Sequence, residues 1–122
     1  MSIARFALVA LDCPDPRSLA EFYQRIVGGE IREPVTEEWV RLLIPNGSDL
    51  GFQLDPSYQP PQWPYGLPQQ AHLDFDVSDL DEGEQAVLAA GARKADHQPS
   101  PDDWRVFLDP AGHPFCLCLT AP

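Results

Sequence analysis

The residues best suited to chemistry in this chain of 122 residues lie on one predicted strand, from Ala71 to Val77. Apolar and polar side chains alternate along it, which is typical of a strand with one buried face. His72, Asp74 and Asp76 share the polar face. An imidazole and two carboxylates on one face must be solvated, paired, metal-bound or turned toward a polar cavity. This strand is therefore the first candidate for a binding or catalytic site.

Each of these side chains has a structural and a functional interpretation. His72 is either a hydrogen-bonded residue at the start of a strand or a possible acid/base catalyst that its acidic neighbours assist. Asp74 and Asp76 are either rim residues facing water or the carboxylates that hold a cationic ligand. Cys116 and Cys118 share one face of the predicted last strand. With His72 and Asp74 they could form a zinc site, although buried cysteines usually act as small apolar residues.

The composition excludes several classes of partner. The formal net charge is −11 and the isoelectric point is about 4.3, so phosphate backbones and anionic membranes would be repelled. No apolar run approaches the roughly 20 residues that span a bilayer, and we expect no secretion signal after Met1. Three cysteines form no even disulfide framework. We expect a cytoplasmic protein with free thiols and no nucleic-acid or membrane partner.

The order of predicted elements is strand, helix and three strands, given twice. In the first half a strand over 6–11 precedes a helix that begins at Asp15 and Pro16 and ends at Gly28. In the second half the strand over 71–77 precedes a helix over 79–90, because Asp79 and Glu82 form a capping-box pattern. The other predicted strands span 29–33, 38–44 and 50–54 in the first half, with a turn at 45–47, and 93–95, 104–108 and 115–119 in the second.

The two halves are related by an internal repeat. Trp39 and Trp104 lie 65 positions apart, as do the pairs Pro45/Pro110 and Gly47/Gly112. The two predicted helix caps, Asp15 and Asp79, lie 64 positions apart. Four such pairs in order indicate a duplicated unit, which usually packs about a pseudo-two-fold axis. We therefore divide a single domain over 1–122 into module one over 1–55, a proline- and aromatic-rich linker over 56–68, and module two over 69–122.

The linker has three interpretations. It contains Tyr58, Trp63 and Tyr65 between its prolines. It is a stiff connection whose aromatic side chains cover an edge of the core, or a lid over a pocket beside the strand that follows. In the third interpretation it is a polyproline ligand for a partner protein, which would make the chain a non-catalytic interaction module.

Three groups of residues carry a resemblance to a known family: Val9, Asp15, Phe22-Tyr23 and Gly28; His72-Leu73-Asp74; and Asp109-Pro110-x-Gly112. In these residues the chain resembles the vicinal-oxygen-chelate superfamily, and most closely its glyoxalase-like domain branch. The superfamily includes glyoxalase I, bleomycin-resistance proteins, fosfomycin-resistance enzymes and extradiol dioxygenases. The resemblance implies an α+β fold of two βαβββ modules that form a funnel-like half-open β-barrel, usually in a homodimer.

The resemblance also implies where a divalent metal would bind. Metal-using members take ligands from the first and last strands of each module. His72 matches one such position, but Leu8, its counterpart in module one, cannot bind a metal. Cys116 stands where a glutamate is usual, and the remaining position is Gly51 or Gln53. Among the positions that match the family's ligands, only His72 and Cys116 are therefore candidate metal ligands.

The functional prediction follows from this incomplete set. We expect a protein that binds a small organic molecule in the funnel without the usual metal centre. The predicted substrate-binding residues are Asp74, Asp76, Gln53, Trp39, Arg41, Trp104 and Cys118, and Arg105 lies on a strand that could also line the funnel. The alternative is a metal-dependent lyase, isomerase or dioxygenase with a rearranged ligand set around His72. The cofactor is accordingly either none or a divalent metal.

Overall fold

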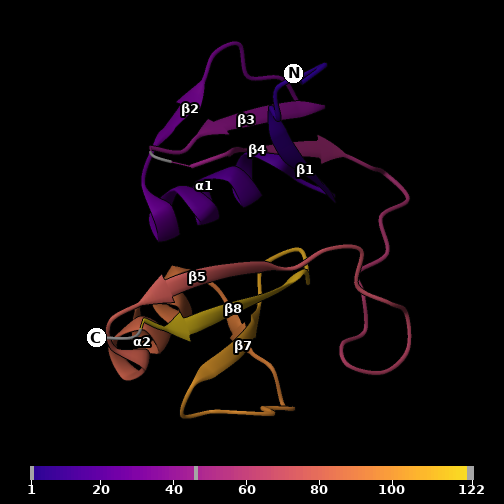
Figure 1. The fold of residues 1–122 in the computed structure, drawn as a ribbon. Coiled ribbons are helices and arrows are strands. Elements are labelled where there is room, and N and C mark those ends of the chain that lie inside the picture. Colours follow the sequence, from indigo (N-terminus) through magenta and orange to yellow (C-terminus); the bar gives the residue numbers. More distant parts are fainter. Residues whose placement is uncertain (1, 46, 121–122) are drawn as a thin grey trace. The chain divides into compact units, whose positions relative to one another are not determined.

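The computed structural model describes residues 2–45 and 47–120, and the chain divides into two compact units, Met1–Tyr58 and Gln59–Pro122. Each unit contains one helix and one four-stranded sheet (Figure 1). The first unit holds β1 (Leu8–Cys13), α1 (Pro16–Val27), β2 (Glu30–Arg32), β3 (Trp39–Leu43) and β4 (Asp49–Leu54). The second holds β5 (Leu73–Val77), α2 (Leu80–Ala90), β6 (Arg93–Lys94), β7 (Trp104–Leu108) and β8 (Pro114–Leu119).

The two sheets have the same topology. Their strand orders are β1-β4-β3-β2 and β5-β8-β7-β6. In each unit the first and last strands pair in parallel, and the other neighbours are antiparallel. Neither sheet closes into a barrel by itself. The duplicated βαβββ plan predicted from the repeat is therefore confirmed.

Element boundaries differ from the prediction mainly at β1. The apolar run predicted a strand over 6–11, whereas β1 spans Leu8–Cys13. Its parallel partner β4 begins at Asp49, which pairs with Leu8, so residues before Leu8 have no facing strand in this sheet. Phe6 is accordingly 71% exposed. The turn predicted at 45–47 includes Asn46, which lies outside the described residues.

Both helices begin at the predicted caps. The Asp15 carboxylate accepts hydrogen bonds from the Ser18 backbone N–H at 3.2 Å and from the Ser18 hydroxyl at 2.8 Å. The Asp79 carboxylate accepts from the Glu82 N–H at 2.9 Å. The two bonds from backbone N–H groups satisfy donors that the first helical turn leaves without a partner inside the helix. Helix α2 ends at Gly91, whose φ of +119° is left-handed and favours glycine.

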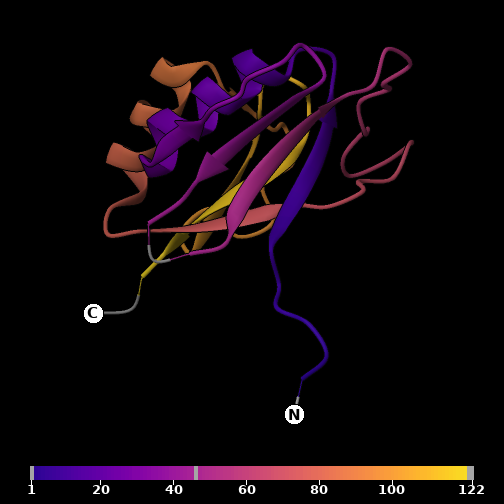
Figure 2. The same ribbon diagram turned by 90° about the horizontal axis from the view of Figure 1, so that it is seen from above.

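In the first unit, α1 packs on one face of the sheet (Figure 2). Leu19, Phe22 and Tyr23 on the helix are buried, and the Tyr23 ring stacks on Phe52 of β4 with centroids 5.8 Å apart. Alternation along β4 directs Gly51 and Gln53 away from the helix. Leu8 has the same parity on β1 as Ala10, which pairs with Gly51, so it also lies on the face away from α1.

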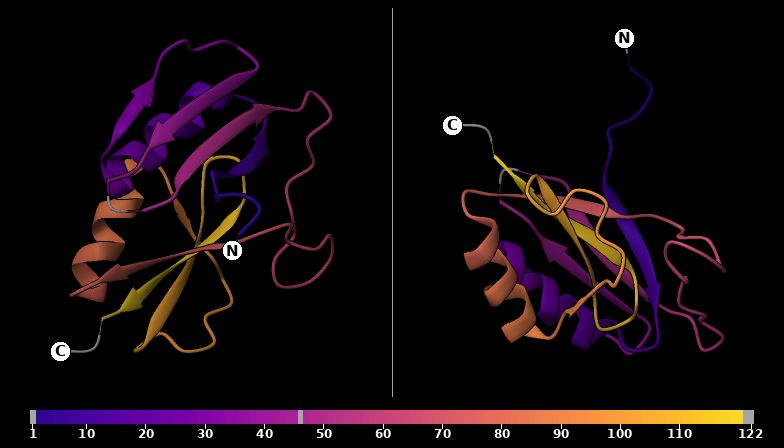
Figure 3. Two further views of the ribbon diagram at one scale, coloured as in Figure 1. Left: turned by 45° about the horizontal axis from the view of Figure 1, so that its top comes forward. Right: turned by 90° about the horizontal axis from the view of Figure 1, so that it is seen from below.

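In the second unit, α2 lies along one face of its sheet (Figure 3). The ideal Cβ position of Gly83 on α2 lies 3.1 Å from Leu117 and 3.2 Å from Val77, so these side chains face the helix. Phe115 stacks on Phe107 with ring centroids 5.7 Å apart on the same face. Because side chains alternate along a strand, the neighbouring residues of β5, β7 and β8 face the other way.

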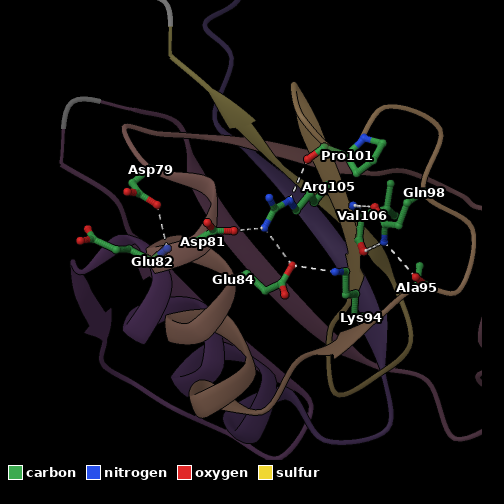
Figure 4. A network of polar contacts seen from close by, with 10 residues as sticks. All are labelled: Asp79, Asp81, Glu82, Glu84, Lys94, Ala95, Gln98, Pro101, Arg105 and Val106. Atoms are coloured by element: carbon green, nitrogen blue, oxygen red, sulfur yellow. Dashed lines mark hydrogen bonds and ion pairs between the residues drawn. The ribbon is translucent and has the colours of Figure 1, made fainter.

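A polar network joins α2 to β6 and β7 (Figure 4). The Arg105 guanidinium donates to Asp81 at 2.9 Å and to Glu84 at 3.2 Å, and Lys94 donates to Glu84 at 3.0 Å. Arg105 also donates to the Pro101 carbonyl at 2.8 Å. These bonds hold the Arg105 side chain on the helix side of the sheet. Within the described part of the chain, neither helix is long and apolar enough to cross a membrane.

Candidate binding cavity

The register of β5, β8 and β7 gathers polar and aromatic side chains on the face away from α2. Asp74 pairs with Cys116 and Asp76 with Cys118 across the parallel β5–β8 ladder. On the other side of β8, Trp104 pairs with Cys118 and Val106 with Cys116. Residues that pair in register lie on the same face of a sheet. The alternation predicted for β5 and β8 therefore brings the candidate residues of both strands together.

Two adjoining hollows lie on this face. The larger, of about 260 Å³, is lined by His72, Asp74, Trp104, Cys116 and Cys118. The smaller, of about 140 Å³, shares three of these residues and is more apolar; its lining is Trp63, Gln69, His72, Trp104, Val106, Pro114 and Cys116. Because they share a wall, we treat them as one cavity with a polar and an apolar compartment, and call it the β5–β8 cavity.

His72 lies at the polar edge of this cavity. Its Nδ1 is 3.4 Å from the Gln69 amide nitrogen, and its Nε2 is 3.5 Å from Asp74 Oδ1. The side chains of His72 and Asp74 are 43% and 58% exposed. The imidazole is thus oriented from both sides and still open to solvent, so it can exchange a proton with a molecule in the polar compartment.

The two thiols of the cavity remain protonated at neutral pH. Burial, followed by the neighbouring Asp74 carboxylate and the Cys118 thiol, raises the pKa of Cys116 to about 12. Burial also raises the pKa of Cys118, to which Asp74 and Asp76 add. Because a thiolate is both the nucleophile and the metal ligand, these cysteines are poor candidates for either role. They give the cavity an uncharged floor.

The residues do not fit the metal centre usual in the resembling family. Among the residues that the structure describes, no group of three or more His, Cys, Asp or Glu side chains is arranged to hold a metal ion. Leu8 and Gly51 carry no donor atom, and Gln53 is exposed on β4. Of the matching positions, His72 and Cys116 carry metal-binding side chains, and the Cys116 thiol, whose pKa is raised, would first have to lose its proton.

Three predicted site residues lie in the first unit. Trp39 and Gln53 line a hollow of about 310 Å³ with Glu38, Leu54 and Pro56. The Trp39 ring lies directly over Gly51, where a Cβ atom would overlap it. Arg41 is paired instead, because its Nη2 and Nε donate to Asp49 Oδ2 at 2.7 and 3.1 Å.

A more voluminous hollow in the first unit contains none of the predicted site residues. It measures about 460 Å³ and is lined by residues at the start of α1 and of the segment before β3, including Asp15, Arg17, Thr36 and Glu37. This hollow is open to solvent, and the Asp15 carboxylate in its lining already caps α1. We therefore do not treat it as the candidate site.

Two further predicted residues, Asp76 and Arg105, lie on opposite faces of the second sheet. Asp76 lies beside Cys118 at the rim of the β5–β8 cavity, on the same face as Asp74. Arg105, which lay on a strand that could line the funnel, instead faces α2 and is ion-paired there. An arginine on β7 is thus not available to an anionic substrate in this cavity.

The linker contributes a wall that the sequence only partly indicated. Trp63 packs against the buried cluster of Ala95, Val106 and Cys116, and its ring centroid lies 5.5 Å from that of His97. Pro60 sits against Gly112, at 2.8 Å from the ideal Cβ position there. Trp63 therefore covers a core edge and lines the cavity at once, which combines two of the predicted interpretations. Tyr65 is 81% exposed.

Gln98 is a positioning residue that the sequence did not indicate. Its amide nitrogen donates to the carbonyls of Ala95 and Val106 at 2.9 and 2.8 Å, and its oxygen accepts from the Val106 N–H at 2.9 Å (Figure 4). The side chain thus pairs with β7 where β6 has ended. It fixes Val106, which lines the apolar compartment of the cavity.

Two consecutive βαβββ units, with the β5–β8 cavity on the sheet face away from α2, define a protein with the vicinal-oxygen-chelate fold. The sequence profile of the glyoxalase-like domain matches residues 8–118. The chain therefore belongs to the glyoxalase-like domain family. No curated protein matches the sequence significantly.

Solved structures support the fold. A glyoxalase/bleomycin resistance protein/dioxygenase family enzyme from Burkholderia phytofirmans PsJN is 22% identical, with 97% of this chain and 100% of that chain covered and a TM-score of 0.71. A mutant of the fosfomycin resistance protein FosX from Listeria monocytogenes, complexed with Mn(II) and dihydroxypropylphosphonic acid, is 19% identical, with 98% and 93% covered and a TM-score of 0.73. A protein from Agrobacterium tumefaciens is 20% identical, with 98% and 100% covered and a TM-score of 0.71.

Proposed function

We propose that this chain binds a small organic molecule in the β5–β8 cavity without the metal centre usual in its superfamily. The observation that carries the proposal is the lining of the cavity. Trp63, Trp104 and Val106 supply apolar walls, whereas His72 and Asp74 supply polar groups at one edge. A mostly apolar hollow with a few convergent polar groups is the usual form of a small-molecule site.

The size of the cavity indicates a small ligand. Its compartments measure about 260 and about 140 Å³, so each is smaller than the roughly 300–1,000 Å³ typical of ligand pockets, and the whole cavity lies near the lower end of that range. A compound with one ring and a short polar substituent fits these dimensions better than a large natural product. His72 would then orient the polar substituent or exchange a proton with it.

A thermal-shift screen of small metabolites in the presence of EDTA tests the proposal. Compounds that bind in the cavity should raise the melting temperature of the wild type and lose this effect in Trp104→Ala, because that change removes a wall shared by both compartments. Tyr65→Ala is the matched control, since Tyr65 is an exposed aromatic residue outside the cavity lining. Stabilising compounds that act equally on Trp104→Ala would contradict the proposal.

The second candidate is a metal-dependent lyase, isomerase or dioxygenase with a rearranged ligand set. One observation favours it: His72, Asp74 and Cys116 line the same compartment. Elemental analysis of wild type and His72→Ala, after exposure to zinc, nickel, manganese and iron(II), separates the candidates. One tightly held metal per chain that is lost in His72→Ala would replace the first proposal by the second. Equal and negligible metal in both proteins would end the second.

A further inference from the structure

We propose that the ligand of the β5–β8 cavity is an organic cation: an ammonium group attached to a flat apolar group. The inference rests on the proposed function and adds the chemical class of the ligand. The flat group would occupy the apolar compartment between Trp63 and Trp104, and the ammonium group would lie in the polar compartment near Asp74. Both compartments share Trp104, so one molecule can reach both.

The charge of the polar edge favours a cation. Asp74 and Asp76 lie on the cavity face of β5, and His72 is the histidine beside them. Even a protonated imidazole would offset only one of the two carboxylates. The Cys116 and Cys118 thiols add no charge at neutral pH. The polar edge therefore has an excess of negative charge.

The basic side chains of the second unit lie away from the polar edge of the β5–β8 cavity. The unit has ten Asp and Glu residues against three basic ones, Arg93, Lys94 and Arg105. Arg105 and Lys94 are ion-paired on the α2 side of the sheet. Arg93 pairs with Leu108, at the opposite end of β7 from Trp104, or roughly 13 Å along the strand. An external cation is thus the complement that the polar edge lacks.

The aromatic walls favour the same ligand class. An ammonium group within about 6 Å of an indole face is attracted by the negative potential of the ring. Trp104 borders the polar compartment that Asp74 also lines, so one cation can contact a carboxylate and an indole together. Trp63 and Val106 border the apolar compartment, where a flat hydrocarbon group loses its contact with water.

Three probes of nearly equal shape test the inference: 2-phenylethylamine, 2-phenylethanol and 3-phenylpropionate, which are cationic, neutral and anionic at neutral pH. Binding is followed through the indole N–H signals in a ¹H–¹⁵N NMR spectrum of the full chain, which has three tryptophans. We expect the amine to shift the Trp63 and Trp104 signals and to bind at least about tenfold more tightly than the other two probes.

Two variants test whether the polar edge causes the preference for the amine over the alcohol. Asp74→Asn should weaken amine binding at least about fivefold and change alcohol binding less than about twofold. Asp102→Asn, which removes the same charge from an exposed residue outside the cavity lining, should change amine binding less than about twofold. Equal loss in both variants would mean that only the general acidity of the chain matters, and would overturn the inference.

The outcomes separate the ligand class from the proposed function. If the alcohol or the propionate shifts Trp63 and Trp104 at least as strongly as the amine, the ligand class is wrong and the proposed function stands. If none of the probes shifts either signal at about 10 mM, their dissociation constants exceed this concentration. Both the ligand class and the proposed function are then contradicted.

Discussion

Replacing Gln98 by alanine should destabilise the chain by about 3 kcal/mol. The substitution removes three hydrogen bonds of 2.8–2.9 Å from the wall of the β5–β8 cavity. A neutral hydrogen bond contributes about 1 kcal/mol net, and a buried donor left without a partner costs about 1–3 kcal/mol. Val106 is 1% exposed and Ala95 is 7% exposed, so water cannot readily replace the amide.

The substitution affects the carbonyl and the N–H of Val106 differently. The Val106 carbonyl keeps a hydrogen bond from the Ala95 N–H at 3.1 Å, whereas the Val106 N–H loses its partner Gln98. These terms together give a loss of stability of roughly 2–4 kcal/mol for Gln98→Ala. Because the carbonyl keeps one hydrogen bond, we expect a value in the middle of this range. Such a loss is large against a typical total stability of about 5–15 kcal/mol.

Urea unfolding followed by tryptophan fluorescence measures this effect. With a slope of about 1–3 kcal/mol per molar urea, the midpoint should fall by roughly 1–3 M. Gln98→Glu should be at least as destabilising, because a carboxylate keeps the acceptor for the Val106 N–H but faces two carbonyl oxygens without a proton to donate. Gln85→Ala, at an exposed position of α2, is the matched control and should change stability by less than about 0.5 kcal/mol. A Gln98→Ala effect as small as this control would refute the reasoning.

Three further predictions concern other parts of the structure. Gly51→Ala should displace the Trp39 ring, because the new Cβ would overlap it, and should shift the Trp39 indole N–H signal in an NMR spectrum; an unshifted signal would contradict the contact. Asp15→Ala should cost about 1 kcal/mol through the lost helix cap. The Ser18 hydrogen bonds lower the pKa of Asp15 in the folded state, so the advantage of wild type over this variant should be present above the unfolded pKa and disappear as the pH falls through the folded pKa; urea unfolding at several pH values checks the sign. Cys116, with a pKa of about 12, should react with iodoacetamide at pH 8 at least ~30-fold more slowly than free cysteine, and mass spectrometry that found rapid labelling would exclude a buried protonated thiol.

Local sequence patterns predicted the fold because its elements depend on local chemistry. Asp15 and Asp79 cap helices through bonds to residues only three positions away, so the signal lies within one turn. Strict alternation around Asp74 placed the polar face of β5 in the same way. The internal repeat then gave the order of strands twice. The predicted start of β1 was wrong, because the position of the partner strand, rather than hydrophobicity, decides where pairing begins.

The cavity could be predicted only in part, because its walls depend on contacts between distant segments. His72, Asp74 and Cys116 were predicted from alternation and from the resemblance. Trp63 was recognised as an aromatic in the linker, but its packing beside Val106 depends on how the linker returns to the sheet. Gln98 gave no signal, since a glutamine in a polar loop usually faces solvent. The pairing of Arg41 with Asp49 likewise depends on register across two strands.

The position of a bound ligand tests the central claim most directly. A stabilising compound from the screen would be added to isotope-labelled protein in EDTA, and nuclear Overhauser effects from the compound to the protein would be measured. We predict contacts to the Trp63 and Trp104 rings and to the Val106 methyl groups, which together line the β5–β8 cavity. Contacts confined to the hollow of the first unit around Glu38, with none to these three residues, would contradict the account.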